Sequence, residues 1–359
     1  MAVRFIGNKQ KLLDFILQKV IEETNLTSGL FVDLFTGTTS VAIGAKKLGF
    51  DVITNDKLIS SFIYSKAGLL VNEEPRFENL LPNIDVNTDS LFEQPYDLVL
   101  QYLNNLPEIE GLFYKEYAPG GSAKYLSEPR QYFTDNNAKK IDAIRIKINY
   151  WYKKKLIDDI ERSLLISSLI LATNKVANIS GTYGAYLKSW YNRALEKIEL
   201  ERYPLFFSNG NYSVFNEDAN NLVKKLKTAD IVYIDPPYTK RQYNAYYHIP
   251  ETLAIGDNPK VWGKTGQRPR QGDETSAYCY KREARNALHE LVNNIKARHI
   301  FLSYSTDGHI SHNEILDILS TKGEPKYWGV DYKRFRSNNP EGGKIEGLKE
   351  MLYYVEVID

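Results

Sequence analysis

Hydrophobic residues at the start of the chain recur at helical spacing and then give way to short apolar runs. Apolar positions three and four residues apart predict an amphipathic helix over residues 11–23. The apolar runs at residues 30–35 and 52–54 are typical of buried parallel strands. A helix between these strands is expected to be capped by a hydroxyl of residues 38–40 and to stop at Gly49. The pattern therefore predicts one βαβ unit.

The middle of the chain has a different pattern. Residues 61–205 are rich in Tyr, Asn and Lys, and their apolar positions are mostly helical in period. Four later apolar runs predict further strands, at residues 212–215, 231–234, 299–303 and 351–357. The expected fold class is therefore α/β, with a sheet interrupted by a mostly helical insertion.

The composition excludes several classes of protein. With 43% hydrophobic residues among 359, the chain can form a packed core and is not disordered. No apolar stretch reaches the ~18 residues of a membrane span and the start lacks a signal-peptide apolar block, so a soluble, cytoplasmic protein is expected. The single cysteine, Cys279, cannot form an internal disulfide or a cysteine-based zinc cluster. A net charge of +1 means that a nucleic-acid partner requires basic residues gathered on one surface.

Two stretches concentrate basic side chains. Residues 139–155 interleave lysines and arginine with aromatic residues, which suits either a solvated helix face or a nucleic-acid surface. The stretch from Lys260 to Arg285 suits either a DNA-contacting loop or an ordinary surface loop. Its other basic residues are Lys264, Arg268, Arg270, Lys281 and Arg282.

The strongest chemical signal is Asp235-Pro236-Pro237-Tyr238, which directly follows the apolar run at 231–234. A carboxylate at the carboxyl end of a parallel strand lies where open α/β sheets bind ligands. Two prolines fix successive φ angles, so the Asp235 carboxylate and the Pro236 carbonyl form a rigid acceptor pair beside an aromatic ring. Such a pair suits an exocyclic amino group on a heterocycle that stacks on Tyr238; the alternative is a plain strand-end turn.

A second signal surrounds the first strand. Phe35-Thr36-Gly37 forms a glycine-bearing turn after that strand, with Asp33 before it and Asp56 at the end of the next strand. This spacing is typical of a nucleoside site in which the acid accepts hydrogen bonds from ribose hydroxyls. The G-x-G-x-x-G pyrophosphate motif is absent, which favours a nucleoside without phosphates over a dinucleotide.

The order of these motifs resembles the Dam-like N6-adenine DNA methyltransferases of the alpha group. The motifs that carry the resemblance are Phe5-Ile6-Gly7-Asn8-Lys9, Asp33-Leu34-Phe35-Thr36-Gly37-Thr38, Asn55-Asp56, Asp218 and Asp235-Pro236-Pro237-Tyr238. Residues 177–186 and 239–243 also look like members linked to restriction systems. The chain departs from the family pattern at Thr39, where a second glycine is expected; threonine there is expected to narrow the pocket for the cofactor's methionine end.

The resemblance implies roles for individual residues toward S-adenosylmethionine. Phe5 and Lys9 are expected to line its methionine end, and Asp33 and Gly37 to lie near its amino-acid moiety. Phe35 is also expected to bind the cofactor. Asp56 is expected to hold the ribose hydroxyls and Asp218 to face the adenine amino group, with Asp235 shared between cofactor and catalysis.

The resemblance also implies a mechanism. The catalytic residues are expected to be Asp235, Pro236, Pro237 and Tyr238. Two acceptors suited to a pyramidal nitrogen free the lone pair of the amine, and so bind the transition state better than the planar amine. The target adenine is flipped out of the duplex to reach them.

The resemblance thus implies a Rossmann-like methyltransferase sheet of seven strands, formed by residues 1–60 and 206–359, with residues 61–205 as a helical target-recognition insertion. The expected partners are double-stranded DNA and a possible cognate restriction endonuclease, with no membrane. Methyl transfer to cytosine N4, a non-catalytic DNA-binding subunit of the same fold and, less favoured, methylation of RNA stay open. A metal site at His309 and His312 and a P-loop at Gly263-Lys264-Thr265 are not supported by the neighbouring sequence.

Overall fold

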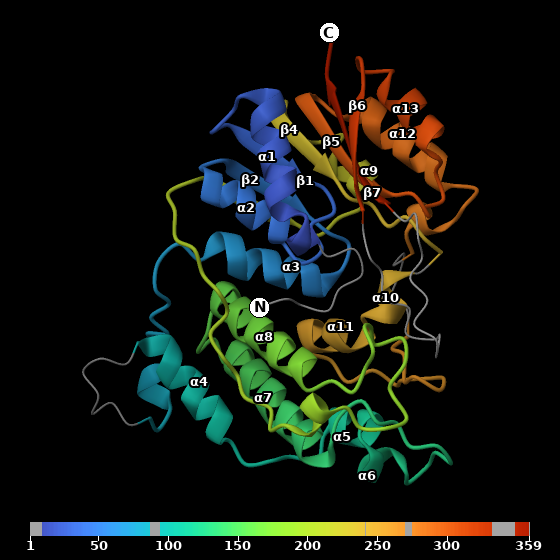
Figure 1. Ribbon diagram of the computed structural model, residues 1–359. Coiled ribbons are helices and arrows are strands. Elements are labelled where there is room, and N and C mark those ends of the chain that lie inside the picture. The colour runs from blue at the N-terminus through green and yellow to red at the C-terminus, as the bar shows by residue number, and fades with distance from the viewer. Residues whose placement is uncertain (1–8, 87–93, 241, 270–274, 332–348, 359) are drawn as a thin grey trace. The chain divides into compact units, whose positions relative to one another are not determined.

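The computed structural model describes residues 9–86, 94–240, 242–269, 275–331 and 349–358. The chain forms two compact units, which we call the sheet unit and the helical unit. The sheet unit comprises Gly7–Ser65, Ser208–Asn244 and Gly272–Asp359, and the helical unit comprises Met1–Ile6, Lys66–Phe207 and Ala245–Gln271. Figure 1 shows the elements of both units along the chain.

The sheet unit holds one seven-stranded sheet of order β3-β2-β1-β4-β5-β7-β6. Its strands are β1 (Leu30–Asp33), β2 (Asp51–Asn55), β3 (Tyr212–Phe215), β4 (Ala229–Ile234), β5 (Ala297–Ser305), β6 (Lys326–Asp331) and β7 (Lys349–Glu356). The first five strands pair in parallel, whereas β7 runs antiparallel between β5 and β6. The predicted α/β methyltransferase-type sheet is confirmed.

Helices cover both faces of the sheet. The helices of this unit are η1 (Lys9–Lys11), α1 (Leu13–Thr24), α2 (Ser40–Leu48), α3 (Ile59–Ser65), α9 (Ala219–Leu222), η5 (Ala277–Cys279), α12 (Ala284–Asn294) and α13 (His312–Leu319). Figure 1 shows α1 and α2 on one side of the sheet and α12 and α13 on the other. Because side chains alternate along a strand, Val32 joins the core under α12 and α13, while the Phe31 ring lies 6.0 Å from that of Phe50 on the opposite face.

Two details of the sheet unit differ from the sequence prediction. Helix α2 begins after Thr39, whose φ is 65°, and no side chain caps it, although it ends at Gly49 as predicted. Strand β6 was not predicted, because it is an edge strand of mixed polarity with Tyr327 half exposed and a glycine in its middle. Its apolar positions are therefore too few to give a clear period.

The helical unit is built mainly on α7 and α8. Its helices are η2 (Lys66–Leu70), η3 (Leu81–Asn83), α4 (Pro95–Asn105), α5 (Leu112–Tyr117), α6 (Pro119–Ser122), α7 (Asp135–Lys153), α8 (Asp159–Lys175), η4 (Asn192–Leu195) and α11 (His248–Ile255). The short helix α10 (Tyr243–Tyr246) lies where the chain passes from one unit to the other. Helical content over residues 61–205 is as predicted, but the helical unit also includes α11. No helix in the part of the chain that the structure describes is long and apolar enough to cross a membrane.

The basic stretch 139–155 is only partly a surface. Arg145 is buried and forms an ion pair of 2.9 Å with the buried Asp142, whose carboxylate also accepts the backbone N–H groups of Phe113 and Tyr114. Trp151 is buried as well, whereas Tyr150 is half exposed. This stretch therefore supplies part of the helical unit's core, so neither sequence interpretation describes all of it.

Candidate functional site

The site lies at the carboxyl end of the sheet, where three acidic residues meet. Asp33 ends β1, Asp56 directly follows β2, and Asp235 directly follows β4. These strands are neighbours in the order β2-β1-β4, and β1 is where the strand order changes side, with β2 and β3 on one side and β4 on the other. Such a switch point in an open α/β sheet is the usual place for a ligand. The structure therefore brings the three predicted acids to one edge.

The turn after β1 is fixed by Asp56. The backbone N–H of Gly37 donates to Asp56 Oδ2 at 2.8 Å, and the N–H of Leu58 donates to Asp56 Oδ1 at 2.9 Å. Gly37 has a φ of 50°, which is in the left-handed region that glycine adopts without strain. Asp56 thus orders the glycine-bearing turn.

Thr39 holds the position where the family pattern has glycine. Its φ of 65° is left-handed, a conformation that costs a β-branched residue roughly 1–2 kcal/mol. Thr39 is fully buried, and its Oγ1 lies 3.3 Å from Ser65 Oγ on α3. The backbone therefore keeps the geometry of a glycine at this position. That Thr39 narrows a cofactor pocket stays a prediction.

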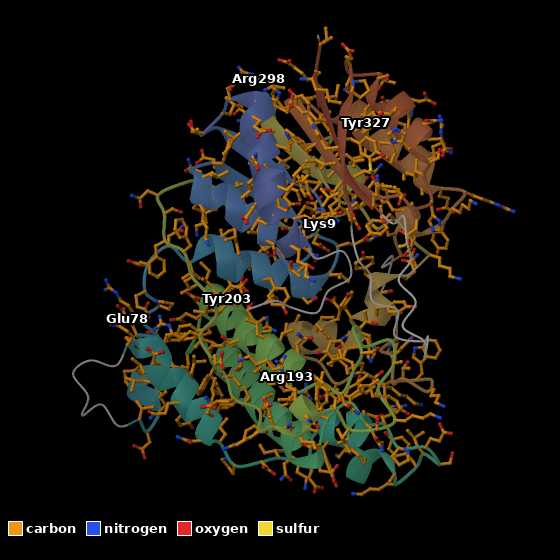
Figure 2. The ribbon with its side chains drawn as sticks, viewed as in Figure 1. Lys9, Glu78, Arg193, Tyr203, Arg298 and Tyr327 are labelled. Carbon is orange, nitrogen blue, oxygen red and sulfur yellow. The ribbon has the colours of Figure 1, made fainter. Side chains whose placement is uncertain are left out.

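Lys9 places an ammonium group beside the residue predicted to be catalytic. Lys9 Nζ lies 2.9 Å from Asp235 Oδ1, and 5.6 Å from the centre of the Tyr238 ring. The side chain of Lys9 is only 5% exposed and that of Asp235 15% exposed. Figure 2 labels Lys9, which leads into α1 from η1. Lys9 thus lies beside Asp235, whose catalytic role stays a prediction.

The Tyr238 ring is buried in this structure. It is 2% exposed and contacts Tyr304 edge-on at 5.7 Å between ring centres. Its carbonyl accepts the backbone N–H of His309 at 2.9 Å, which holds the end of the two-proline turn. A base that stacks on Tyr238 must therefore displace what covers the ring, and the predicted stacking stays a prediction.

Burial shifts the pKa values of the ionisable side chains at this edge of the sheet. Burial, reinforced by the charge of Asp235, raises the pKa of Asp33 to about 8. Burial also raises the pKa of Asp235 and of Asp56 to about 6 each, although Lys9 opposes the shift at Asp235 and backbone N–H groups oppose it at Asp56. Burial by itself lowers the pKa of Lys9, but the neighbouring negative charges, Asp235 foremost, outweigh it and hold that pKa above its ordinary value. At neutral pH Asp33 is thus protonated while Asp235 and Lys9 are charged.

Asp218 lies at a separate corner of the sheet unit. It caps the short helix α9, where its Oδ1 accepts the N–H of Asn220 at 3.0 Å, and its Oδ2 lies 3.8 Å from Lys57 Nζ. The nearby ring of Tyr278 donates its hydroxyl to Asn220 Oδ1 and meets Phe35 edge-on at 5.2 Å between centres. This corner has the aromatic and acidic groups suited to an adenine ring, but the role predicted for Asp218 stays a prediction.

Sequence reasoning missed two residues of the site. Tyr278 lies in a stretch of the sequence that carries no motif. Glu350 is the second residue of β7, and its carboxylate lies near both Lys9 and Tyr238. An antiparallel strand brings its first residues to the edge where parallel strands end, so a search of strand ends overlooks Glu350.

The other predicted residues differ in burial and pairing. Pro236 is buried and Pro237 half-buried in the turn after β4. Phe5 and Arg270 lie outside the described residues. Arg268 is buried and paired with Asp257 at 3.0 Å, so it does not offer the phosphate contact considered for its loop. Within the described ranges, no three His, Cys, Asp or Glu side chains are grouped to hold a metal ion.

Residues 5–317 match the model of the family described as D12 class N6 adenine-specific DNA methyltransferase. The chain is 38% identical to the type II methyltransferase M.FokI of Planomicrobium okeanokoites, over 99% of this chain and 52% of that protein. It is 36% identical to the modification methylase StsI of Streptococcus sanguinis, over 99% of this chain and 52% of that protein. It is 33% identical to the type II methyltransferase M.NlaIII of Neisseria lactamica, over 99% of both chains. The chain thus spans about half the length of the first two relatives and nearly all of the third.

The raised pKa of Asp33 predicts how stability depends on pH. Between pH 3.8 and about 8, the folded protein keeps a proton that the unfolded chain has lost. The free energy of unfolding therefore falls as pH rises through this window. The substitution Asp33→Asn stays neutral in both states, so the variant is expected to be more stable than the wild type at pH 8.5 by at least about 1 kcal/mol.

Urea unfolding at pH 5.5 and pH 8.5 measures this difference. The raised pKa values of Asp235 and Asp56 also make the free energy of unfolding fall as pH rises. The pH dependence of stability is therefore expected to be smaller in Asp33→Asn than in the wild type, but not absent. The exposed Asp317 on α13 supplies the control Asp317→Asn, which is expected to follow the wild type. Equal slopes in Asp33→Asn and wild type would contradict the buried, protonated Asp33.

Proposed function

Because the chain belongs to the D12 class N6 adenine-specific DNA methyltransferase family, we propose that it is a site-specific DNA-methyltransferase (adenine-specific). It transfers a methyl group from S-adenosylmethionine to N6 of an adenine flipped out of duplex DNA. The observation that carries the proposal is the position of Asp235, directly after β4 in a two-proline turn and beside Tyr238 and Lys9.

The chemistry of the sheet edge suits a cationic cofactor. Asp56, Asp235 and Glu350 outnumber the buried cation, Lys9, at this edge. When bound, S-adenosylmethionine supplies an electrophilic methyl group on a positively charged sulfur. Asp56 would accept hydrogen bonds from the ribose hydroxyls, and the turn at Gly37 would let the cofactor approach the backbone.

The adenine ring of the cofactor would lie at the corner formed by Phe35, Tyr278 and Asp218. The two rings offer apolar faces and edges, and the Asp218 side chain is 41% exposed, so it can accept a hydrogen bond from an amino group. Asp33 and Lys9 would contact the amino-acid end of the cofactor.

Asp235 would act on the amino group of the target base. Its pKa of about 6 leaves the carboxylate charged at neutral pH, so it accepts a hydrogen bond from N6. An acceptor aimed at the pyramidal nitrogen stabilises the transition state more than the planar amine. As the N–C bond forms and the C–S bond breaks, N6 loses one proton to solvent, and no covalent enzyme intermediate is needed.

Restriction-modification is the biological setting we propose. The relatives are named as type II methyltransferases and a modification methylase, and we extend that setting to this chain. Double-stranded DNA is then the partner, and a cognate endonuclease of the same sequence specificity is a functional partner.

Nucleoside analysis of methylated DNA separates the proposal from its rivals. N6-methyladenine is the expected product. N4-methylcytosine as the product would show that the enzyme methylates cytosine instead. With a tritium-labelled methyl group on the cofactor, label found in RNA in preference to DNA would show that RNA is the substrate. No label in mixed genomic DNA would support a non-catalytic subunit and contradict the proposal.

Removing the carboxylate of Asp235 tests its role. Asp235→Ala is expected to lower methyl transfer by at least about 100-fold, because the acceptor for N6 is lost. Calorimetry is expected to show cofactor affinity within about threefold of wild type, because the ribose and adenine corners are unchanged. Asp317→Ala is the control for loss of an exposed acid, and retained turnover in Asp235→Ala would contradict the assignment.

Removing the carboxylate of Asp56 tests the cofactor site. Asp56→Ala is expected to weaken cofactor binding by about 10–100-fold, because charge-assisted hydrogen bonds contribute about 1.5–3 kcal/mol. The amide of Asp56→Asn retains one acceptor and is expected to bind with intermediate affinity. The exposed Asp14 on α1 gives the control Asp14→Ala. An unchanged dissociation constant in Asp56→Ala would count against the ribose role.

A further inference from the structure

Glu350 is a buried acid at the predicted catalytic edge. It is 4% exposed and is the second residue of β7. Its neighbours across the sheet are Ser305 near the end of β5 and Val330 of β6. Because β7 runs antiparallel to β5, its first residues lie at the same edge as the last residues of the parallel strands.

The carboxylate of Glu350 contacts two residues of the site at once. Lys9 Nζ donates to Glu350 Oε2 at 3.4 Å, and the hydroxyl of Tyr238 donates to Glu350 Oε1 at 3.3 Å. Lys9 also lies 2.9 Å from Asp235 Oδ1. One ammonium group therefore lies between two carboxylates, nearer to Asp235 than to Glu350.

The Lys9 ammonium contacts the two groups that the substrate base is proposed to use. Lys9 is ion-paired with the carboxylate that is proposed to accept from N6, and it lies over the ring on which the base is proposed to stack. When the adenine amino group donates to Asp235, the ammonium loses part of that contact. A buried ammonium without an acceptor is costly, so it needs another carboxylate within reach. Glu350 is already in contact.

We propose that Glu350 is a positioning residue of methyl transfer: it takes the Lys9 ammonium when the substrate amine occupies Asp235, and it orients the Tyr238 ring through its hydroxyl. The proposal rests on the proposed function and names a residue for which no motif gives a role. Glu350 acts through Lys9 and Tyr238 and does not itself touch the reacting atoms.

Stability alone is a weak reason for such an arrangement. Buried ion pairs often stabilise a fold no more than apolar residues of similar volume, because desolvation offsets the attraction. A second buried acid beside Asp235 also adds repulsion, which contributes to the raised pKa of Asp235. A role in moving the ammonium accounts for both carboxylates, whereas a structural ion pair needs only one.

The substitution Glu350→Gln removes the charge and keeps the size of the side chain. Of the two carboxylates only that of Asp235 then attracts the ammonium, so kcat is expected to fall about tenfold, while the dissociation constant of S-adenosylmethionine changes less than about threefold. The matched control is Glu356→Gln, the same change at the exposed far end of β7, which is expected to retain wild-type kcat. An unchanged kcat in Glu350→Gln would overturn the proposal.

The pH profile distinguishes positioning from a merely structural role. The charged groups that face Asp235 are Lys9 from η1, Glu350 from β7, Asp33 at the end of β1 and Asp56 after β2. Removing the negative charge of Glu350 lowers the pKa of Asp235, so the acidic limb of kcat/KM is expected to move down by about 0.5–1 pH unit in Glu350→Gln. Loss of activity with an unmoved acidic limb would indicate only a structural role and would overturn the proposal.

A second variant keeps the proposal testable if Glu350→Gln does not fold. Tyr238→Phe removes the hydroxyl that donates to Glu350 and keeps the ring, and it is expected to lower kcat about 2–10-fold without moving the acidic limb. Wild-type kcat in Tyr238→Phe would overturn the orienting role. N6-methyladenine production by the wild type is scored separately, so failure of the proposed function is distinguished from failure of the role of Glu350.

Discussion

One buried ammonium group between two carboxylates is the constraint on which the site depends. Removing charged groups from water is unfavourable unless each finds a partner, and the Lys9 ammonium is the partner within reach of both Asp235 and Glu350. This shared cation keeps Asp235 charged in spite of its burial, because its attraction opposes the desolvation that raises the pKa. The catalytic proposal thus depends on a residue of η1 as much as on the turn after β4.

The sheet topology explains why these groups meet. Parallel strands β1, β2 and β4 end side by side, so Asp33, Asp56 and Asp235 reach one edge from distant parts of the sequence. The antiparallel strand β7 begins at that same edge and adds Glu350. A site of this type receives its charged groups from strand ends, while the strands themselves stay apolar and pack in the core.

The sequence predicted well what depends on local pattern and less well what depends on pairing. Apolar runs predicted six of the seven strands that the structure describes. The two-proline turn and the acids at 33, 56 and 235 lie at the ends of such runs, so the sequence also predicted their place at the sheet edge. Strand β6 was missed because an edge strand lacks a strong apolar period. Glu350 was missed because its place depends on the direction of β7, and the burial of Tyr238 depends on Tyr304 from another strand.

The ion pair between Lys9 and Glu350 joins residues that lie far apart in the sequence, which has a consequence for biosynthesis. Lys9 and Glu350 are 341 positions apart, so a ribosome must synthesise nearly the whole span between them before the pair can form. Closing so long a loop has an entropic cost, which must be offset by other contacts of the sheet. A nascent chain that lacks β7 would leave the Lys9 ammonium on Asp235 alone. The cluster of Lys9, Asp235 and Glu350 is therefore complete only once the last strand has been synthesised.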